Sequence, residues 1–191
     1  MPPLTTLDAI QAEVWRQLAS ATHDKHHAWR SPVLATAATD GADARTVILR
    51  EIDADARCLR IFTDERAAKV AQLMSHPNGT LVMWSPALGW QLRCRVRLTV
   101  QSQGLAATSR WALVKLSPAA QDYLSPLPPG AVLAGDSPGA PRPAHAATLP
   151  PPQPHFAIIE AQVLAIDWLE LKRSGHRRAL FDDQGARWVQ P

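Results

Sequence analysis

Long apolar runs and cysteine motifs are both missing from this chain of 191 residues. No apolar run approaches the roughly eighteen residues that a membrane-spanning helix needs, so no membrane span is expected. The two cysteines, Cys58 and Cys94, stand in no metal-binding or redox spacing and are expected to be buried, reduced thiols. The N-terminus lacks the charged-then-apolar pattern of a secretory signal. We therefore expect a cytoplasmic protein.

The chain also has no large excess of charge of either sign. The net charge is +3, from 20 basic and 17 acidic residues, and no run of like charges suggests a tail that binds nucleic acid. No G-x-S-x-G or Ser-His-Asp arrangement supports hydrolase chemistry. The histidines at 23, 26 and 27 have no cysteine, and no carboxylate beyond Asp24, at ligand spacing. We expect neither a nucleic-acid partner nor a metal site.

The hydrophobic pattern predicts many short strands and a few helices. An amphipathic helix is expected over 6–22, where Thr5 or Thr6 can cap its first turn. Further helices are expected at 66–75, 106–116 and 117–123. The expected strands are 32–39, 46–52, 58–63, 80–84, 90–101, 156–166, 167–171, 176–181 and 187–189. This arrangement favours a mainly β fold of the α+β type, built as a closed or split barrel.

One segment differs from the rest in composition. Residues 125–154 hold ten of the 17 prolines and three of the nine glycines. Such a composition predicts a loop or covering arm instead of a packed element. With no internal repeat elsewhere, we expect residues 1–191 to form one domain with this proline-rich loop.

The expected strand at 90–101 alternates cleanly. Leu92, Cys94, Val96 and Leu98 should line a core, and Gln91, Arg93, Arg95 and Arg97 should point the other way. The arginine face can be read as a solvated surface or as a polar dimer interface beside a bound anion.

A cluster of cations points to phosphate binding. Arg45 and Arg50 bracket the strand Arg45-Thr46-Val47-Ile48-Leu49-Arg50, and Arg66 and Lys69 are expected in the first turn of the next helix. The free N–H groups and the dipole of a helix N-terminus favour an anion, and added cations make a phosphate clamp. No G-x-G-x-x-G is present for a pyrophosphate.

These blocks, with Phe62-Thr63-Asp64-Glu65-Arg66-Ala67-Ala68-Lys69 and Trp90-Gln91-Leu92-Arg93, resemble the FMN-binding split-barrel family related to pyridoxamine 5'-phosphate oxidase, and in particular its shorter members. A C-terminal tryptophan strand followed by H-x-R adds to the resemblance, since Trp168 lies eight residues before His176 and ten before Arg178. The resemblance spans roughly residues 30–189. It implies an FMN-binding split β-barrel with a few peripheral helices. It also implies a homodimer with flavin sites at the subunit interface, each built from both chains.

The resemblance also implies roles for individual residues. Arg45 and Lys69 would contact the FMN phosphate, and the Gln91 amide would reach the flavin. His176 would face the substrate side, and no catalytic residue can be named. The full set of expected cofactor contacts is Arg45, Thr46, Val47, Ile48, Leu49, Arg50, Phe62, Thr63, Arg66, Lys69, Gln91, Trp168 and Arg178.

Three departures bear on the substrate. Ala67 replaces a serine that could donate to the phosphate, and Ser174 stands where the true oxidases carry an arginine. No arginine lies between Arg110 and Arg142, in the stretch where those oxidases hold the substrate phosphate. We therefore predict an FMN-dependent oxidoreductase acting on a small organic molecule. The alternatives are a pyridoxamine 5'-phosphate oxidase in the strict sense, a non-catalytic flavin-binding protein, and a barrel that has lost its flavin.

Overall fold

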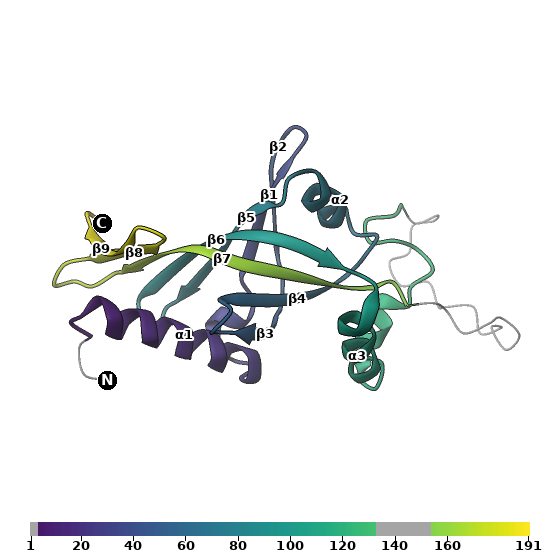
Figure 1. The fold of residues 1–191 in the computed structure, drawn as a ribbon, viewed down its shortest axis with the longest axis horizontal. Helices are drawn as coiled ribbons and strands as arrows, with labels where there is room; N and C mark the ends of the chain where they lie inside the picture. Colours follow the sequence, from purple (N-terminus) through teal and green to yellow (C-terminus); the bar gives the residue numbers. More distant parts are fainter. Residues whose placement is uncertain (1–3, 133–153) are drawn as a thin grey trace, which may run out of the picture.

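The computed structural model describes residues 4–132 and 154–191, so most of the proline-rich loop lies outside the described residues. The described chain forms a nine-stranded antiparallel sheet with peripheral helices (Figure 1). The strands are β1 (Val33–Ala38), β2 (Gly41–Thr46), β3 (Leu49–Asp53), β4 (Cys58–Asp64), β5 (Asn78–Ser85), β6 (Trp90–Gln101), β7 (Phe156–Glu170), β8 (Arg177–Asp182) and β9 (Gly185–Val189). The expected mainly β fold is confirmed.

The strands follow the order β2-β1-β5-β6-β7-β4-β3, and β8 and β9 extend from β7 as a hairpin. The sheet does not close, because β2 and β3 lie at opposite ends of this order. β7 runs the length of the molecule, from the α3 end to the β8–β9 hairpin (Figure 1). It pairs with β4 through its first half and with β8 through its last residues.

Helices cover the sheet at three places. They are α1 (Leu7–His23), α2 (Ala68–Ser75) and α3 (Gly104–Val114), with short 3₁₀ turns η1 (Ala28–Arg30) and η2 (Pro118–Tyr123). The Thr6 side chain accepts a hydrogen bond from the Ala9 N–H at 3.2 Å, which confirms the expected cap of α1. Within the described residues, no helix combines the length and apolar character needed to cross a membrane.

The structure corrects two of the sequence expectations. The strand expected at 46–52 is divided, because the chain leaves β2 at Thr46 and enters β3 at Leu49. The helix expected at 66–75 begins at Ala68, so Arg66 precedes it and only Lys69 lies in its first turn. The first difference falls where the chain crosses from one end of the open sheet to the other, and the second where it passes from β4 to β5.

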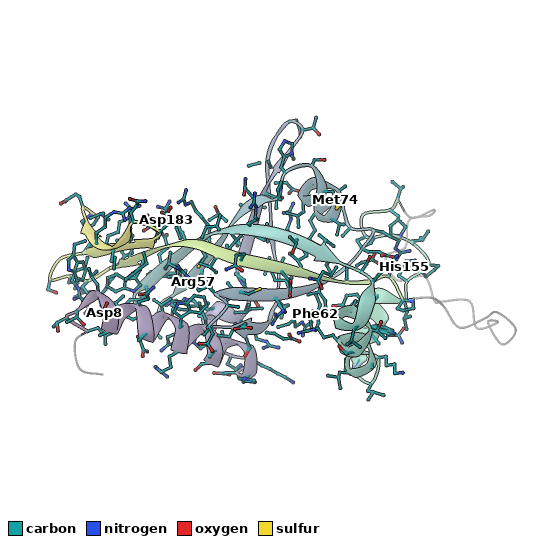
Figure 2. All side chains as sticks on the ribbon, in the orientation of Figure 1. Asp8, Arg57, Phe62, Met74, His155 and Asp183 are labelled. Carbon is teal, nitrogen blue, oxygen red and sulfur yellow. The ribbon has the colours of Figure 1, made fainter. Side chains whose placement is uncertain are left out.

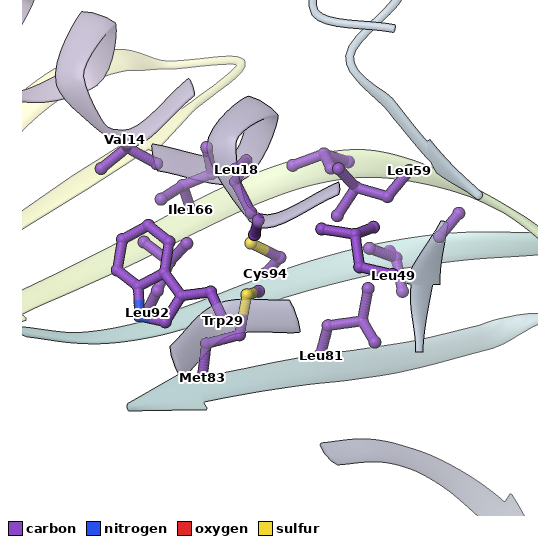
Figure 3. Close-up of a cluster of buried hydrophobic side chains, with 14 of the residues drawn as sticks. Val14, Leu18, Trp29, Leu49, Leu59, Leu81, Met83, Leu92, Cys94 and Ile166 are labelled. Carbon is purple, nitrogen blue, oxygen red and sulfur yellow. The ribbon is translucent and has the colours of Figure 1, made fainter. Parts of the chain in front are cut away.

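The main core lies between α1 and the inner face of the sheet. Ile10, Val14 and Leu18 of α1 are fully buried against strand residues such as Leu92 and Cys94 (Figure 3). Along β6, burial alternates residue by residue, which confirms that Leu92, Cys94, Val96 and Leu98 line the core. Burial raises the pKa of the Cys94 thiol to about 12, so this cysteine is an apolar packing group.

A second, smaller apolar cluster joins α3 and η2 to the first residues of β7. Phe156 packs edge-on to Tyr123 and Phe62, with ring centroids 5.2 and 5.1 Å apart. Arg110 of α3 also donates two hydrogen bonds of 2.9 Å to the Glu51 carboxylate on β3. These contacts hold η2 against the end of β4, where they form one wall of the site described next.

Candidate functional site

A hollow of about 250 Å³ opens where the ends of β2, β3 and β4 meet the start of α2 and the η2 turn. It is lined by Thr46, Val47, Ile48, Arg50, Ile61, Phe62, Thr63, Asp64, Ala67, Lys69, Asp122, Tyr123 and Pro129. The structure therefore brings together seven of the expected contacts: Thr46, Val47, Ile48, Arg50, Phe62, Thr63 and Lys69. Leu49 lies between them in sequence, but its side chain is fully buried in the core.

Lys69 lines this hollow and forms no ion pair with a carboxylate among the described residues. Its ammonium donates to the Thr63 hydroxyl at 3.2 Å. Burial lowers the pKa of Lys69, and the neighbouring charge of Arg45 lowers it further. A partly buried ammonium near a second cation is stabilised by an anion. The first turn of α2 therefore fits a phosphate group.

Arg50 and Tyr123 form the opposite wall. The Arg50 Nε atom is buried and has no hydrogen-bond partner in the part of the chain that the structure describes. Burial raises the pKa of Tyr123, while the adjacent Arg50 guanidinium, hydrogen-bonded to its hydroxyl, acts in the opposite direction. A buried donor without a partner is costly, so this wall is also built for a polar ligand.

Arg45 stands behind the hollow and does not line it. Its guanidinium donates to the Thr36 hydroxyl at 2.6 Å and to the Gln72 amide oxygen at 2.8 Å, and it forms an ion pair with Asp43. Hydrogen bonds from Gln72 and then from Arg45 lower the pKa of Asp43. Arg45 is therefore held in place by the chain itself, close enough to Lys69 to act on its charge.

The Arg66 side chain is held by other groups of the chain. Its side chain pairs with the buried Asp64 at 2.7 Å and donates to the carbonyl oxygen of Ser125 at 2.9 Å. Burial acts to raise the pKa of Asp64, but the hydrogen bonds from Arg66 outweigh it and the pKa is lowered. Arg66 thus fastens the chain after η2 to the end of β4. Its expected contact with the phosphate stays a prediction.

The remaining expected contacts lie at the far end of the sheet. Gln91 on β6 pairs across the ladder with Leu169 on β7, and Leu169 pairs with Arg178 on β8. Arg178 forms an ion pair of 2.8 Å with Asp167. Although burial acts to raise the pKa of Asp167, Arg178 and Arg93 hold it low. His176 lies just before β8, exposed, with Nδ1 accepting from the Lys172 N–H at 3.2 Å.

Trp168 does not share the face of Gln91 and Arg178. Its side chain is fully buried and packs edge-on to Trp90, with centroids 5.2 Å apart. Successive residues of a strand point to opposite faces, so Leu169 takes the position between Gln91 and Arg178. The expected spacing from Trp168 to the H-x-R block is present, and the indole Nε1 is buried without a hydrogen-bond partner among the described residues. Its expected contact with the cofactor stays a prediction.

The two groups of expected contacts cannot meet within one chain. Thr63 of the hollow pairs with Ala157 of β7, and Gln91 pairs with Leu169, twelve residues further along the same strand. At the rise of an extended strand this is a separation of roughly 35–40 Å. Figure 2 shows the same layout, with Phe62 at the α3 end and Asp183 at the opposite end.

Sequence reasoning missed Tyr123 and Asp122 as lining residues and Gln72 as the residue that orients Arg45. Tyr123 is the chain's one tyrosine, and its position after an apolar helical turn was the available signal. Gln72 carried no signal, because its role depends on the packing of α2 against β1 and β2.

Comparisons with known proteins agree with this fold. Residues 12–102 match the sequence model of the family described as pyridoxamine 5'-phosphate oxidase, FMN-binding domain. No curated protein matches the chain. The structure of a pyridoxamine 5'-phosphate oxidase-related, FMN-binding protein from Nostoc punctiforme superposes with a TM-score of 0.70 at 24% identity, covering 99% of this chain and 100% of that one.

Two further structures share the fold. PhzG from Burkholderia lata 383, in complex with tetrahydrophenazine-1-carboxylic acid, gives a TM-score of 0.68 at 18% identity, over 100% of this chain and 94% of that one. An FAD-binding protein from Mesorhizobium loti gives 0.50 at 12% identity, over 82% and 91%. Residues 12–102 are thus similar to the FMN-binding domain of the pyridoxamine 5'-phosphate oxidase family, and the chain as a whole shares the fold of these FMN-binding split-barrel proteins.

Proposed function

We propose that this protein is an FMN-dependent oxidoreductase that acts on a small organic molecule as a cytoplasmic homodimer. The observation that carries the proposal is the hollow at the start of α2. It places two cations around one cavity: the Lys69 ammonium, which pairs with no carboxylate among the described residues, and the Arg50 guanidinium, whose Nε has no acceptor there. The matching domain family binds FMN. These residues fit a ligand with a phosphate at one end and polar ring atoms at the other.

In this proposal, different residues bind different parts of the cofactor. Lys69 and Thr63 bind the phosphate, and Arg45, oriented by Gln72 and Thr36, adds positive charge behind them. The chain between Val47 and Arg50 faces the ribityl chain and the ring. Bound FMN supplies a ring that accepts a hydride from the substrate, and the protein positions that ring and tunes its charge.

The separation of the two groups of contacts supports the proposed dimer. A chain that holds FMN at the start of α2 leaves its own Gln91 and Arg178 at the other end of β7. A second copy can supply them, so each flavin site is complete only at an interface. A cation near the ring carbonyls, such as Arg178 of the second copy, would stabilise negative charge on the ring.

Titration of the purified protein with FMN, followed by flavin fluorescence, tests the proposal. We expect a Kd below about 100 μM, which corresponds to roughly −5.5 kcal/mol. Light scattering at micromolar concentration should report twice the chain mass of 20.8 kDa. Absence of FMN binding in this range, or a monomer that binds FMN fully, would overturn the corresponding part of the proposal. Turnover with an added electron donor separates an enzyme from a non-catalytic flavin-binding protein.

Pyridoxamine 5'-phosphate should be a poor substrate. The only cations among the described lining residues are Lys69 and Arg50, and Lys69 is assigned to the FMN phosphate. Two missing arginine contacts, each of about 1.5–3 kcal/mol, would lower catalytic efficiency by roughly 10²–10⁴-fold. The measurement is formation of pyridoxal 5'-phosphate by the FMN-loaded protein beside a true oxidase. Efficiency within about tenfold of that control would show that another cation holds the substrate phosphate.

A further inference from the structure

Two walls of the hollow come from separate parts of the chain. Asp64, Ala67 and Lys69 lie on the side of β4 and α2, while Tyr123 and Pro129 come from η2 and the segment that follows it. The stretch between Tyr123 and Pro129 is therefore part of the boundary of the hollow. The shape of the hollow depends on how this stretch is held.

The stretch has little backbone hydrogen bonding of its own, because residues 124–130 include three prolines, at 126, 128 and 129. A proline has no N–H, so such a segment cannot join a strand ladder and is fastened mainly through its carbonyl oxygens. The Arg66 guanidinium donates to the carbonyl oxygens of Ser125 at 2.9 Å, Leu127 at 3.3 Å and Pro126 at 3.4 Å. An arginine suits this task because it carries several donors in a fixed fork and no acceptor.

Asp64 orients the same guanidinium. Arg66 Nε and Nη2 donate to the two carboxylate oxygens at 3.0 and 2.7 Å, and the Arg66 backbone N–H donates to Oδ1 at 2.8 Å. Asp64 is only 5% exposed. Turning Arg66 toward a phosphate would leave this buried carboxylate without its partner, which is strongly unfavourable. The pair therefore favours Arg66 as a residue that fastens the wall.

A separate link holds Tyr123. The His155 N–H donates to the Tyr123 carbonyl oxygen at 2.9 Å, and the His155 carbonyl oxygen accepts from the Glu65 N–H at 2.8 Å. His155 lies at the α3 end of the molecule (Figure 2). These bonds involve only backbone atoms, so they do not depend on the Arg66 side chain. Arg66 therefore holds the part of the wall beyond Tyr123, up to Pro129.

We propose that Arg66 is a positioning residue for the bound flavin. With Asp64, it holds residues 125–129 as a wall of the hollow and so slows the release of the cofactor. This inference rests on the proposed FMN site and adds a determinant of how long the site keeps its ligand. A wall acts on any flavin in the hollow, with or without a phosphate. The alternative, direct contact of Arg66 with the phosphate, would act on FMN alone.

The rate of flavin release separates the two roles. Dissociation of FMN and of riboflavin is followed by stopped-flow fluorescence in the wild type, Arg66→Gln and Arg66→Lys. Both variants should release both flavins faster, by the same factor of about 3–10. Arg66→Lys is included because it keeps the charge and loses the fork of donors. Arg187→Gln is the matched control, since it breaks a comparable ion pair of 2.7 Å with Asp182 at the far end of the sheet, and it should release both flavins at the wild-type rate.

Hydrogen exchange of the ligand-free protein tests the fastening without any flavin. The amides of residues 124–131 should exchange faster in both Arg66 variants, and those of α1 should not change. If a single variant fails to fold, the double variant Asp64→Asn/Arg66→Gln takes its place, because it leaves no buried carboxylate unpaired.

The outcomes separate this inference from the proposed function. Faster release of FMN with unchanged release of riboflavin would overturn the inference and make Arg66 a phosphate ligand. Unchanged exchange over residues 124–131, or faster exchange with wild-type release of both flavins, would also overturn it. If the wild type binds neither flavin, the proposed function fails. The role of Arg66 in retaining the flavin then fails with it, even where exchange shows that Arg66 fastens the wall.

Discussion

The two ends of β7 differ in whether the buried charged side chains near them have partners. At the β8 end, the Glu170 carboxylate is buried and accepts hydrogen bonds from Arg177 Nε at 2.7 Å and from Trp90 Nε1 at 3.2 Å. Lys172 pairs with it at 2.8 Å. The Arg177 guanidinium also lies over the rings of Trp168 and Trp188, and it donates to the Leu4 carbonyl oxygen at 2.8 Å.

At the α3 end, two cations are left without such partners. Among the described residues, the Lys69 ammonium hydrogen-bonds the Thr63 hydroxyl and pairs with no carboxylate, and the buried Nε of Arg50 has no acceptor. Buried charge is tolerated only when it is paired or its solvation is replaced. The charges at the β8 end are therefore part of the fold, whereas Lys69 and Arg50 at the α3 end indicate a ligand. The predictions below test this division.

The largest expected effect is on stability at the β8 end. Glu170→Ala leaves Arg177 and the Trp90 N–H without their acceptor, and we expect a loss of about 3–5 kcal/mol in the free energy of unfolding. Urea unfolding measures it. Arg16→Ala is the matched control, because it breaks an exposed helix pair with Glu13 that should contribute little to stability. Equal losses in the two variants would contradict a structural role for the Glu170 cluster.

The next effect is on ligand binding at the α3 end. Lys69→Ala should weaken FMN by about 1.5–3 kcal/mol, or roughly 10–100-fold, because it removes a charge-assisted contact to the phosphate. Riboflavin, which has no phosphate, should bind equally to variant and wild type. The unfolding free energy of the ligand-free protein should not fall, because the variant removes a partly desolvated charge. Lys115→Ala, at an exposed position after α3, is the control. Equal weakening of FMN and riboflavin would remove Lys69 from the phosphate site.

The sequence predicted the buried residues of β6 and the position of the hollow. It did not show which face of the sheet each side chain takes. The alternation of β6 predicted its buried set, and the cation at the start of α2 predicted the place of the hollow. The run from Arg45 to Arg50 looked like one strand, because local pattern cannot show that β2 and β3 lie at opposite ends of an open sheet. The face taken by Trp168 was hidden for a related reason. Spacing to the H-x-R block does not reveal which face a strand residue takes, and only the pairing with Leu92 shows it.

The smallest expected effect is the dependence of stability on pH. The pKa values of Asp64, Asp167 and Glu170 are all lowered in the folded protein by their cationic partners. Since each folded value lies below the unfolded one, these groups stabilise the protein above the ordinary carboxylate pKa, and this stability is lost as the pH falls through the lowered values.

Urea unfolding at a series of pH values between neutral and strongly acidic measures this loss. The unfolding free energy should stay level above the carboxylate range and then fall, with each group contributing at most about 1.4 kcal/mol per pH unit. Asp167→Asn should reduce that slope, because the variant has one fewer carboxylate to protonate beside Arg93 and Arg178. Stability that holds or rises on acidification would show that these pairs do not stabilise the fold. The contrast between the two ends would then rest on packing around the tryptophans instead of on charge.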